Sequence, residues 1–175
     1  MSWFISNVRE AQWIDDGAFG ASVNFQRGER FEEFGLNLAI VWPAQPLCMY
    51  HRESNQEGFL ILAGECLLIV DGKERALRQW DYFHCPAGTN HIIVGAGDGP
   101  AFLLAVGGRT GDGGVVYPVD EVALAHGAGV EQETSKSAEA YAPFPKPIPT
   151  MFDETWLPEV SAPSAKPLAE RPPRD

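Results

Sequence analysis

The amino-acid sequence predicts an all-β domain, either a sandwich or a barrel of short antiparallel strands. Between residues 36 and 106, short apolar or alternating runs are separated by Gly, Pro, Asp and Asn residues. Several short strands at such regular spacing are typical of sandwiches and barrels. The pair Asp71-Gly72 separates two of the runs, and it favours a two-residue hairpin because both of its positions need a positive φ. No segment in this range favours a helix, so we expect a core made of strands.

The expected strands form one core over residues 36–117. In chain order they are residues 36–42, 59–62, 66–70, 73–77, 80–85, 91–94 and 101–106. Residues 1–35 precede this core as an extension. Its expected short extended pieces are Trp3-Phe4, Trp13-Ile14 and 21–26, with a turn at Asp16-Gly17. The chain of 175 residues is long enough for one domain with its own core.

The pattern changes after the core, and residues 118–160 are expected to hold helical turns and an extended arm. Residues 119–126 carry Asp120 and Glu121 near their start and Gly127 just past their end. Acidic residues in the first turn and a glycine after the last turn favour a helix. We therefore expect a two-turn helix there.

Proline dominates the C-terminal part of the chain, since nine of the fourteen prolines follow residue 141. Proline at this density removes backbone donors and favours extended chain. After one further helical turn at 137–141, residues 142–160 are expected to form an arm that packs on the barrel or on the partner in a homodimer. The apolar residues that would be costly to expose are Phe144, Ile148, Met151, Phe152, Trp156 and Leu157. Residues 161–175 are expected to be a disordered tail.

The charge of the chain argues against nucleic acids and membranes as partners. There are 24 acidic and 13 basic residues, which gives a formal net charge of −11 at pH 7. Nucleic acids and anionic membrane surfaces are bound mainly through clustered Lys and Arg, so this chain is expected to bind neither. No run reaches the ~18–20 consecutive apolar residues that a membrane helix needs.

The N-terminal residues and the cysteines predict a cytoplasmic protein. The start of the chain lacks the basic residues, the long apolar stretch and the small-residue cleavage site of a signal peptide. The three cysteines, Cys48, Cys66 and Cys85, have no CxxC spacing. We expect free thiols that pack as small hydrophobic side chains in a reducing compartment.

Two segments of the expected core carry side chains that can bind a metal. If residues 49–53 form a strand, His51 and Glu53 point to the same face, because side chains alternate along a strand. Glu57 follows across a polar turn, and a Pro/Gly turn places His91 at the head of another strand. Two imidazoles with one or two carboxylates suit Mn, Fe, Co, Ni or Zn better than Ca or Mg.

These residues resemble the two conserved motifs of the cupin superfamily. The first motif is a histidine, a second ligand, a glutamate and a glycine at fixed spacing, and it is present as His51, Glu53, Glu57 and Gly64. The second motif, Pro-x-Gly-x-x-His, is present as Pro86, Gly88 and His91, with Asp81 before it. The resemblance covers about 36–106. It implies a double-stranded β-helix, the jelly-roll barrel of cupins, with a divalent transition metal (Fe, Mn, Ni or Zn) on His51, Glu57 and His91, and Glu53 as a candidate fourth ligand.

Glu53 departs from the pattern, because metal-binding cupins of the germin type carry histidine there. As a ligand, Glu53 would complete a set of two His and two Glu that favours harder metals such as Mn or Fe(II). If it turns away, the remaining three residues form the two-His, one-carboxylate set known from non-haem iron oxygenases. The alternative without a metal leaves these residues bonded to a ligand or to each other, and the pKa of at least one carboxyl is then raised.

Because cupins include many activities, the motifs imply a small-molecule ligand without identifying it. The leading hypothesis is a metal-dependent oxygenase or isomerase in which Glu57 or Glu53 serves as ligand or proton acceptor. The first alternative is a non-catalytic module that binds a small molecule. A second alternative is partner binding through PxxP-like stretches of the arm.

Other residues near the motifs have structural interpretations. Tyr50, Trp80 and Tyr82 are expected to pack in the fold rather than line a cavity mouth. Cys85, directly before a proline, is the cysteine expected nearest the pocket. Arg109 follows the last expected strand, so it either faces an anionic substrate or lies on the surface, and the surface is the simpler interpretation.

Overall fold

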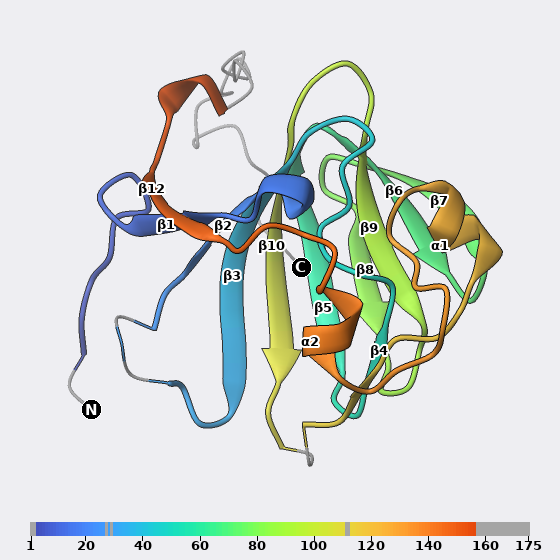
Figure 1. Ribbon diagram of the computed structural model, residues 1–175. Helices are drawn as coiled ribbons and strands as arrows, with labels where there is room; N and C mark the ends of the chain where they lie inside the picture. The colour runs from blue at the N-terminus through green and yellow to red at the C-terminus, as the bar shows by residue number, and fades with distance from the viewer. Residues whose placement is uncertain (1–2, 27, 29, 111–112, 157–175) are drawn as a thin grey trace, which may run out of the picture.

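The computed structural model describes residues 3–26, 28, 30–110 and 113–156 (Figure 1). Within these residues the regular structure consists of twelve strands and four short helical segments. All pairings between the named strands are antiparallel. The predicted all-β class with short helical segments is therefore confirmed. No helix of the described residues is long and apolar enough to cross a membrane.

The strands form a large sheet, a small sheet and a two-stranded ribbon. The large sheet has the order β12-β1-β2-β3-β10-β5-β8. Its strands are β1 Gln12–Asp15, β2 Ala21–Asn24, β3 Phe34–Val41, β5 Glu57–Ala63, β8 Tyr82–Cys85, β10 Ala101–Gly108 and β12 Ile148–Met151. The small sheet, in the order β7-β6-β9, consists of β6 Glu65–Val70, β7 Lys73–Arg78 and β9 His91–Ala96. The ribbon pairs β4 Arg52–Glu53 with β11 Val115–Val116.

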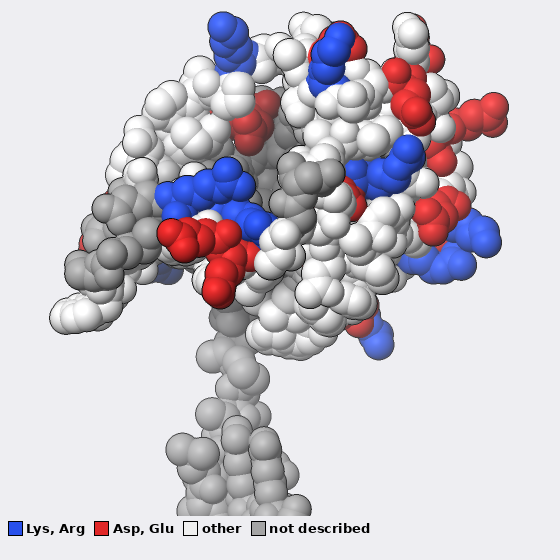
Figure 2. Space-filling model, turned by 90° about the horizontal axis from the view of Figure 1, so that it is seen from below, with Lys and Arg blue, Asp and Glu red and all other residues white. Residues whose placement is uncertain are grey.

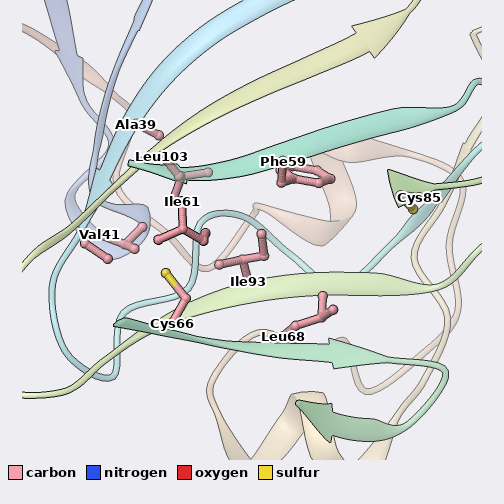
Figure 3. Close-up of a cluster of buried hydrophobic side chains, with 10 residues drawn as sticks. Ala39, Val41, Phe59, Ile61, Cys66, Leu68, Cys85, Ile93 and Leu103 are labelled. Carbon is pink, nitrogen blue, oxygen red and sulfur yellow. The ribbon is translucent and has the colours of Figure 1, made fainter. Parts of the chain in front are cut away.

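The main hydrophobic core lies between the two sheets (Figure 3). Ile61 of β5 and Leu103 of β10 enter it from the large sheet, and both are fully buried. Leu68 of β6 and Ile93 of β9 face them from the small sheet. Each fully buried aliphatic side chain of this kind contributes about 1.5–3 kcal/mol, so this layer holds the two sheets together.

The hairpin predicted from Asp71-Gly72 is present between β6 and β7. Both residues have a positive φ, 45° for Asp71 and 69° for Gly72. Asp and Gly are among the residues that tolerate this region. The register of the hairpin, with Val70 opposite Lys73, agrees with a two-residue loop.

The segment after β3 runs along the edge of β9 and carries the chain to His51. Ala44 donates its backbone N–H to Gly95 O at 2.9 Å, and Gly95 donates to Gln45 O at 2.9 Å. Further along, His51 and His91 exchange backbone hydrogen bonds as an isolated antiparallel bridge. The expected strand over 49–53 is thus only partly present, because residues 49 and 50 belong to no strand, His51 forms an isolated bridge, and only the end of the segment forms β4.

The helix predicted over 119–126 is present but shorter, as α1 Glu121–Ala125. The Asp120 side chain accepts a hydrogen bond from the backbone N–H of Ala123 at 2.9 Å, which caps the first turn. Gly127 follows the helix with a φ of 68°. The residues expected to begin and to end the helix do so in the structure. The segment between them is long enough for little more than one helical turn.

The first part of the C-terminal arm packs on the barrel of the same chain. A short helix, α2 Ser137–Ala140, precedes it, and the helical turn expected at 137–141 is confirmed. The Phe144 ring meets the Phe19 ring at 4.7 Å between centroids, edge to face. Phe19 belongs to η1 Gly17–Phe19, which lies where a turn was expected.

The second part of the arm adds the outermost strand of the large sheet, since β12 pairs with β1 over four residues. Phe152 and Trp156 then pack on the fully buried Trp13 of β1. Trp156 ends the 3-10 turn η2 Glu154–Trp156. Leu157 and the tail expected at 161–175 lie outside the described residues.

Two of the expected strands differ from the structure. Trp3-Phe4 is not in a strand, and Trp3 is among the most exposed apolar side chains. The strand expected at 80–85 begins only at Tyr82, because Trp80 has a φ of 74°, which no strand accommodates. A tryptophan in the left-handed region is sterically unfavourable, and a propensity argument does not anticipate it.

The approach of the 43–47 segment to β9 predicts that Gly95 tolerates no side chain. A Cβ built on Gly95 overlaps the backbone carbonyl of Trp42. We expect Gly95→Ala to lower the free energy of unfolding by about 3 kcal/mol, at the upper end of overpacking effects. Urea unfolding measures this. Gly99→Ala is the matched control, because a Cβ at Gly99 meets nothing within 4 Å. Equal stability of the two variants would contradict the described packing.

Candidate metal centre

Two histidines and one glutamate from different parts of the barrel meet at one end of the core. The backbone bridge described above sets His51 opposite His91, with N–O distances of 3.2 and 2.8 Å. Glu57 begins β5, where it lies opposite Cys85 of β8 and Gly107 of β10. The ligand atoms of the three residues lie within 4.8 Å of one another. The structure thus brings together three of the four residues singled out from the sequence.

The closest approach in this cluster is between His91 and Glu57. Nε2 of His91 lies 3.3 Å from Oε2 of Glu57, and Nε2 of His51 lies 3.9 Å from the same oxygen. Both imidazoles are buried, and the Glu57 side chain is nearly so. Three donors therefore face a common point with little access to bulk water.

Backbone carbonyls fix which nitrogen of each imidazole faces that point. Nδ1 of His51 lies 2.8 Å from Met49 O, and Nδ1 of His91 lies 3.1 Å from Thr89 O. A carbonyl oxygen only accepts, so each Nδ1 carries the proton and donates it. In the neutral form of each ring, Nε2 then presents a lone pair to the cluster, which is the arrangement found in metal-ligating histidines.

One buried polar atom in the cluster has no hydrogen-bond partner. Among the buried side-chain nitrogen and oxygen atoms of the described residues, Nε2 of His91 is the one left unsatisfied. Glu57 Oε2 is near it, but the angles are not those of a hydrogen bond. Because a buried unpaired polar atom costs about 1–3 kcal/mol, this nitrogen fits a ligand position for a cation.

The pKa values of the cluster indicate that a positive charge is favoured at its centre. Burial, and then the neighbouring Glu57, raise the pKa of the Glu53 carboxyl. Burial opposes protonation of His91, but Cys85 and Glu57 outweigh it and raise its pKa to about 10. Burial and the charge of His91 lower the pKa of His51. One positive charge beside the carboxylates is therefore favoured, whereas a positive charge on both neighbouring histidines at once is unfavourable.

Glu53 lies next to the cluster rather than within it. Its Oε1 is 3.8 Å from Nε2 of His51, and its side chain is 37% exposed. The backbone O of Glu53 accepts a hydrogen bond from Gly88 N at 2.8 Å, which ties β4 to the turn before His91. The side chain thus faces the cluster from its open side, where it is placed either to ligate or to meet a substrate.

The cluster opens into a cavity of about 280 Å³ inside the barrel. Phe59 and Ile93 form part of its apolar wall. Phe19, Tyr117 and Tyr141 complete the wall from outside the strands that carry the two motifs. A site of this kind, largely apolar with a few convergent polar groups, is typical of small-molecule binding.

The sequence interpretation was right for one aromatic residue near the motifs, wrong for two, and did not anticipate two others. Tyr50 is buried in a separate core cluster, as expected of a packing residue. Trp80 and Tyr82 are largely exposed, at 68% and 63%, and neither lines the cavity. Tyr117 and Tyr141 line the cavity but were not anticipated, because each lies far along the chain from both motifs.

The two thiols nearest the cluster lie behind the histidines. Sγ of Cys85 is 3.3 Å from Nδ1 of His91, and Sγ of Cys48 is 3.7 Å from Nδ1 of His51. Both sulfurs thus meet the nitrogen that faces away from the common point. Cys48, rather than the expected Cys85, lines the cavity. The third thiol, Cys66, is buried in the main core.

Residues 37–107 match the family model of the cupin domain. The chain therefore contains a cupin domain, and the range covers His51, Glu53, Glu57 and His91. No curated protein matches the sequence.

Solved structures agree with the cupin fold. An RmlC-like cupin from Shewanella frigidimarina NCIMB 400 is 16% identical with a TM-score of 0.54, covering 63% of this chain and 95% of that one. The polyketide cyclase RemF from Streptomyces resistomycificus is 13% identical with a TM-score of 0.54, covering 62% and 80%. A sugar phosphate isomerase from Silicibacter pomeroyi DSS-3 is 23% identical with a TM-score of 0.48, covering 74% and 79%. The first two of these structures support the double-stranded β-helix, and identities of this size show nothing about activity.

The burial of the thiols predicts low reactivity in the folded protein. Burial raises the pKa of Cys48 far above its usual range and that of Cys66 to about 12. The thiolate is the reactive form, so at pH 8 we expect slow reaction with Ellman's reagent, and rapid labelling of all three thiols in urea. One equivalent labelled within seconds in the native protein would contradict this burial. Cys66→Ala identifies the contribution of the core thiol.

Proposed function

We propose that the chain binds one divalent transition metal, such as Fe, Mn, Ni or Zn, through His51, Glu57 and His91. The observation that carries this proposal is the buried, unpartnered Nε2 of His91, 3.3 Å from the Glu57 carboxylate. The backbone bonds that hold both Nδ1 atoms support it further. Imidazole and carboxylate donors together suit these metals better than Ca or Mg.

A bound metal would supply Lewis-acid or redox chemistry to a small organic molecule in the adjoining cavity. Residues of the chain itself would exclude water from the site and supply its negative charge. Phe59 and Ile93 exclude water from the apolar wall, and Glu57 contributes negative charge to the cluster. The reaction classes that fit are oxidation by dioxygen and isomerisation.

Glu53 is the proposed proton acceptor when it does not ligate. Its carboxyl lines the cavity, and its pKa is raised by burial and by Glu57. A carboxyl with a raised pKa exchanges a proton with substrate more readily near neutral pH. When Glu53 does ligate, the protein supplies two imidazoles and two carboxylates, and Glu57 keeps its place as the buried ligand.

The alternative function is non-catalytic binding of a small molecule. It is favoured by Phe19, Tyr117 and Tyr141, which line the cavity although they lie outside both sequence motifs. An adjoining hollow of about 260 Å³ shares Phe19, Cys48 and Tyr141 with the cavity and is lined by Phe144. Side chains from residues 1–35 and 118–160 thus line the cavity, and they can hold a ligand whether or not it reacts. Metal binding without turnover on any oxidisable or isomerisable probe would favour this function.

The expected metal content follows from the ligand set. We expect about one metal per chain by elemental mass spectrometry of protein purified without chelator, and its loss in His91→Ala. Saturating metal at 100 times its Kd should stabilise the folded protein by about 2.7 kcal/mol. His84→Ala is the matched control, because His84 is an exposed histidine on β8. Glu53→Gln retains metal if Glu53 faces substrate and weakens binding if it ligates. No metal in any sample after reconstitution would overturn the proposal.

A homodimer is proposed as the assembly. Among the described residues, the edge strand β8 pairs only with β5, and Tyr82 on this strand and Trp80 just before it are exposed. Open edges with large apolar side chains are favourable sites for association. The free thiols of the chain fit the reducing cytoplasm as its location.

Light scattering tests this assembly. We expect twice the mass of one chain, and a shift toward the monomer in Trp80→Asn, since asparagine tolerates the positive φ at that position. Trp3→Asn is the control, because Trp3 is also exposed, at 87% against 68% for Trp80, but belongs to no strand. A monomer for the unmodified protein at high concentration would contradict the proposal.

A further inference from the structure

A second, polar chamber adjoins the cavity of the proposed metal site. It has a volume of about 380 Å³ and shares Asn37, Glu53, Glu57 and Ala105 with that cavity. Its outer wall carries two arginines, Arg30 and Arg109. Figure 2 views the molecule from this end, where Lys and Arg side chains gather beside Asp and Glu side chains around a hollow.

Arg109 is held in place by neutral groups. Its Nη1 donates to Gln26 Oε1 at 2.9 Å and to Phe31 O at 2.7 Å. Its backbone N–H donates to Glu33 O at 2.9 Å. A Cβ at Gly35 would lie 3.1 Å from Nη2, so the glycine leaves room for the guanidinium. The side chain is therefore positioned by the fold rather than extended into solvent.

The two arginines of the chamber form no ion pair with the residues that the structure describes. Neither Arg109 nor Arg30 forms an ion pair there, whereas Arg9, Arg52 and Lys136 do. Acidic residues outnumber basic ones in this chain, with a net charge of −11. A positioned guanidinium that bonds only to neutral acceptors keeps its charge and its remaining donors for a ligand.

The other wall of the chamber brings backbone close to any ligand. Gly107 and Gly108 end β10, and both line the chamber together with Gly35 and Gly113. Glycine has no side chain, so the space between the arginines and Glu53 stays open. The chamber thus connects Arg109 with Glu53 and Glu57, which also line the cavity of the proposed metal site.

We infer that the ligand of this protein carries an oxyanion, a carboxylate or a phosphate, that binds Arg109 and Arg30 while its other end faces the metal site. This inference rests on the proposed function for the reacting end and on the second chamber for the anionic end. Guanidinium donors match the oxygens of carboxylates and phosphates in a fixed geometry. The anionic group thereby orients the ligand, because Glu53 and Glu57 repel it from the inner end.

The test is a titration of the full chain with inorganic phosphate and with acetate at constant ionic strength. The arginine Nε–Hε signals in ¹H–¹⁵N spectra report binding at each guanidinium. We expect saturable shifts of the Arg109 and Arg30 signals, and about ten-fold weaker binding in Arg109→Gln, as for the loss of a charged hydrogen bond. The tighter probe identifies which oxyanion the site prefers.

Three further variants separate anion binding at the two arginines from other causes of a shift in the arginine signals. Arg30→Gln changes only the exposed arginine and keeps the test valid if Arg109→Gln does not fold. Arg75→Gln is the matched control, because Arg75 is exposed on β7 and bonds only to the backbone O of Glu74. His91→Ala should still show saturable shifts of the Arg109 and Arg30 signals, so failure of the metal proposal leaves this result intact. Unshifted arginine signals, or equal weakening by Arg75→Gln, would overturn the inference.

Discussion

The site depends on one antiparallel bridge, the pair of backbone hydrogen bonds between His51 and His91. These bonds, at 3.2 and 2.8 Å, fasten the segment that follows β3 to the head of β9. Without them, His51 would lie on a loop free to move away from the core. Because side chains of directly opposed residues lie on the same face of a sheet, the bridge also sets the two imidazoles 4.8 Å apart between ring centroids.

The remaining features of the site follow from that placement. Each Nδ1 meets a backbone carbonyl close by in the chain, so both Nε2 atoms face the point that Glu57 also faces. The carboxylate is held at the start of β5 by pairing with β8 and β10. The barrel core behind it is apolar, which strengthens interactions between charges in the cluster. The same burial makes an unmatched charge there costly, and a cation on these ligands removes that cost.

The sequence predicted the barrel and the composition of the cluster well, because local rules determine them. Asp71-Gly72 predicts a hairpin and Pro86-x-Gly88 a turn that delivers His91. The predicted strand through His51 was only partly present, since isolated bridges to β9 replace a continuous ladder. Tyr117, Tyr141 and Arg109 could not be assigned to the cavity and its outer chamber from sequence, because only tertiary packing brings them to the site. Whether Glu53 ligates also depends on a side-chain orientation that spacing does not determine.

The most direct test of the metal site is X-ray absorption spectroscopy of the metal-loaded protein at the edge of the bound metal. The account predicts nitrogen and oxygen neighbours only, with the multiple scattering of two imidazoles, reduced to one imidazole in His91→Ala. Cys48 and Cys85 lie on the far side of the two rings, so sulfur should be absent from the coordination shell. A sulfur neighbour, or imidazole scattering unchanged in the variant, would contradict the proposed ligand set.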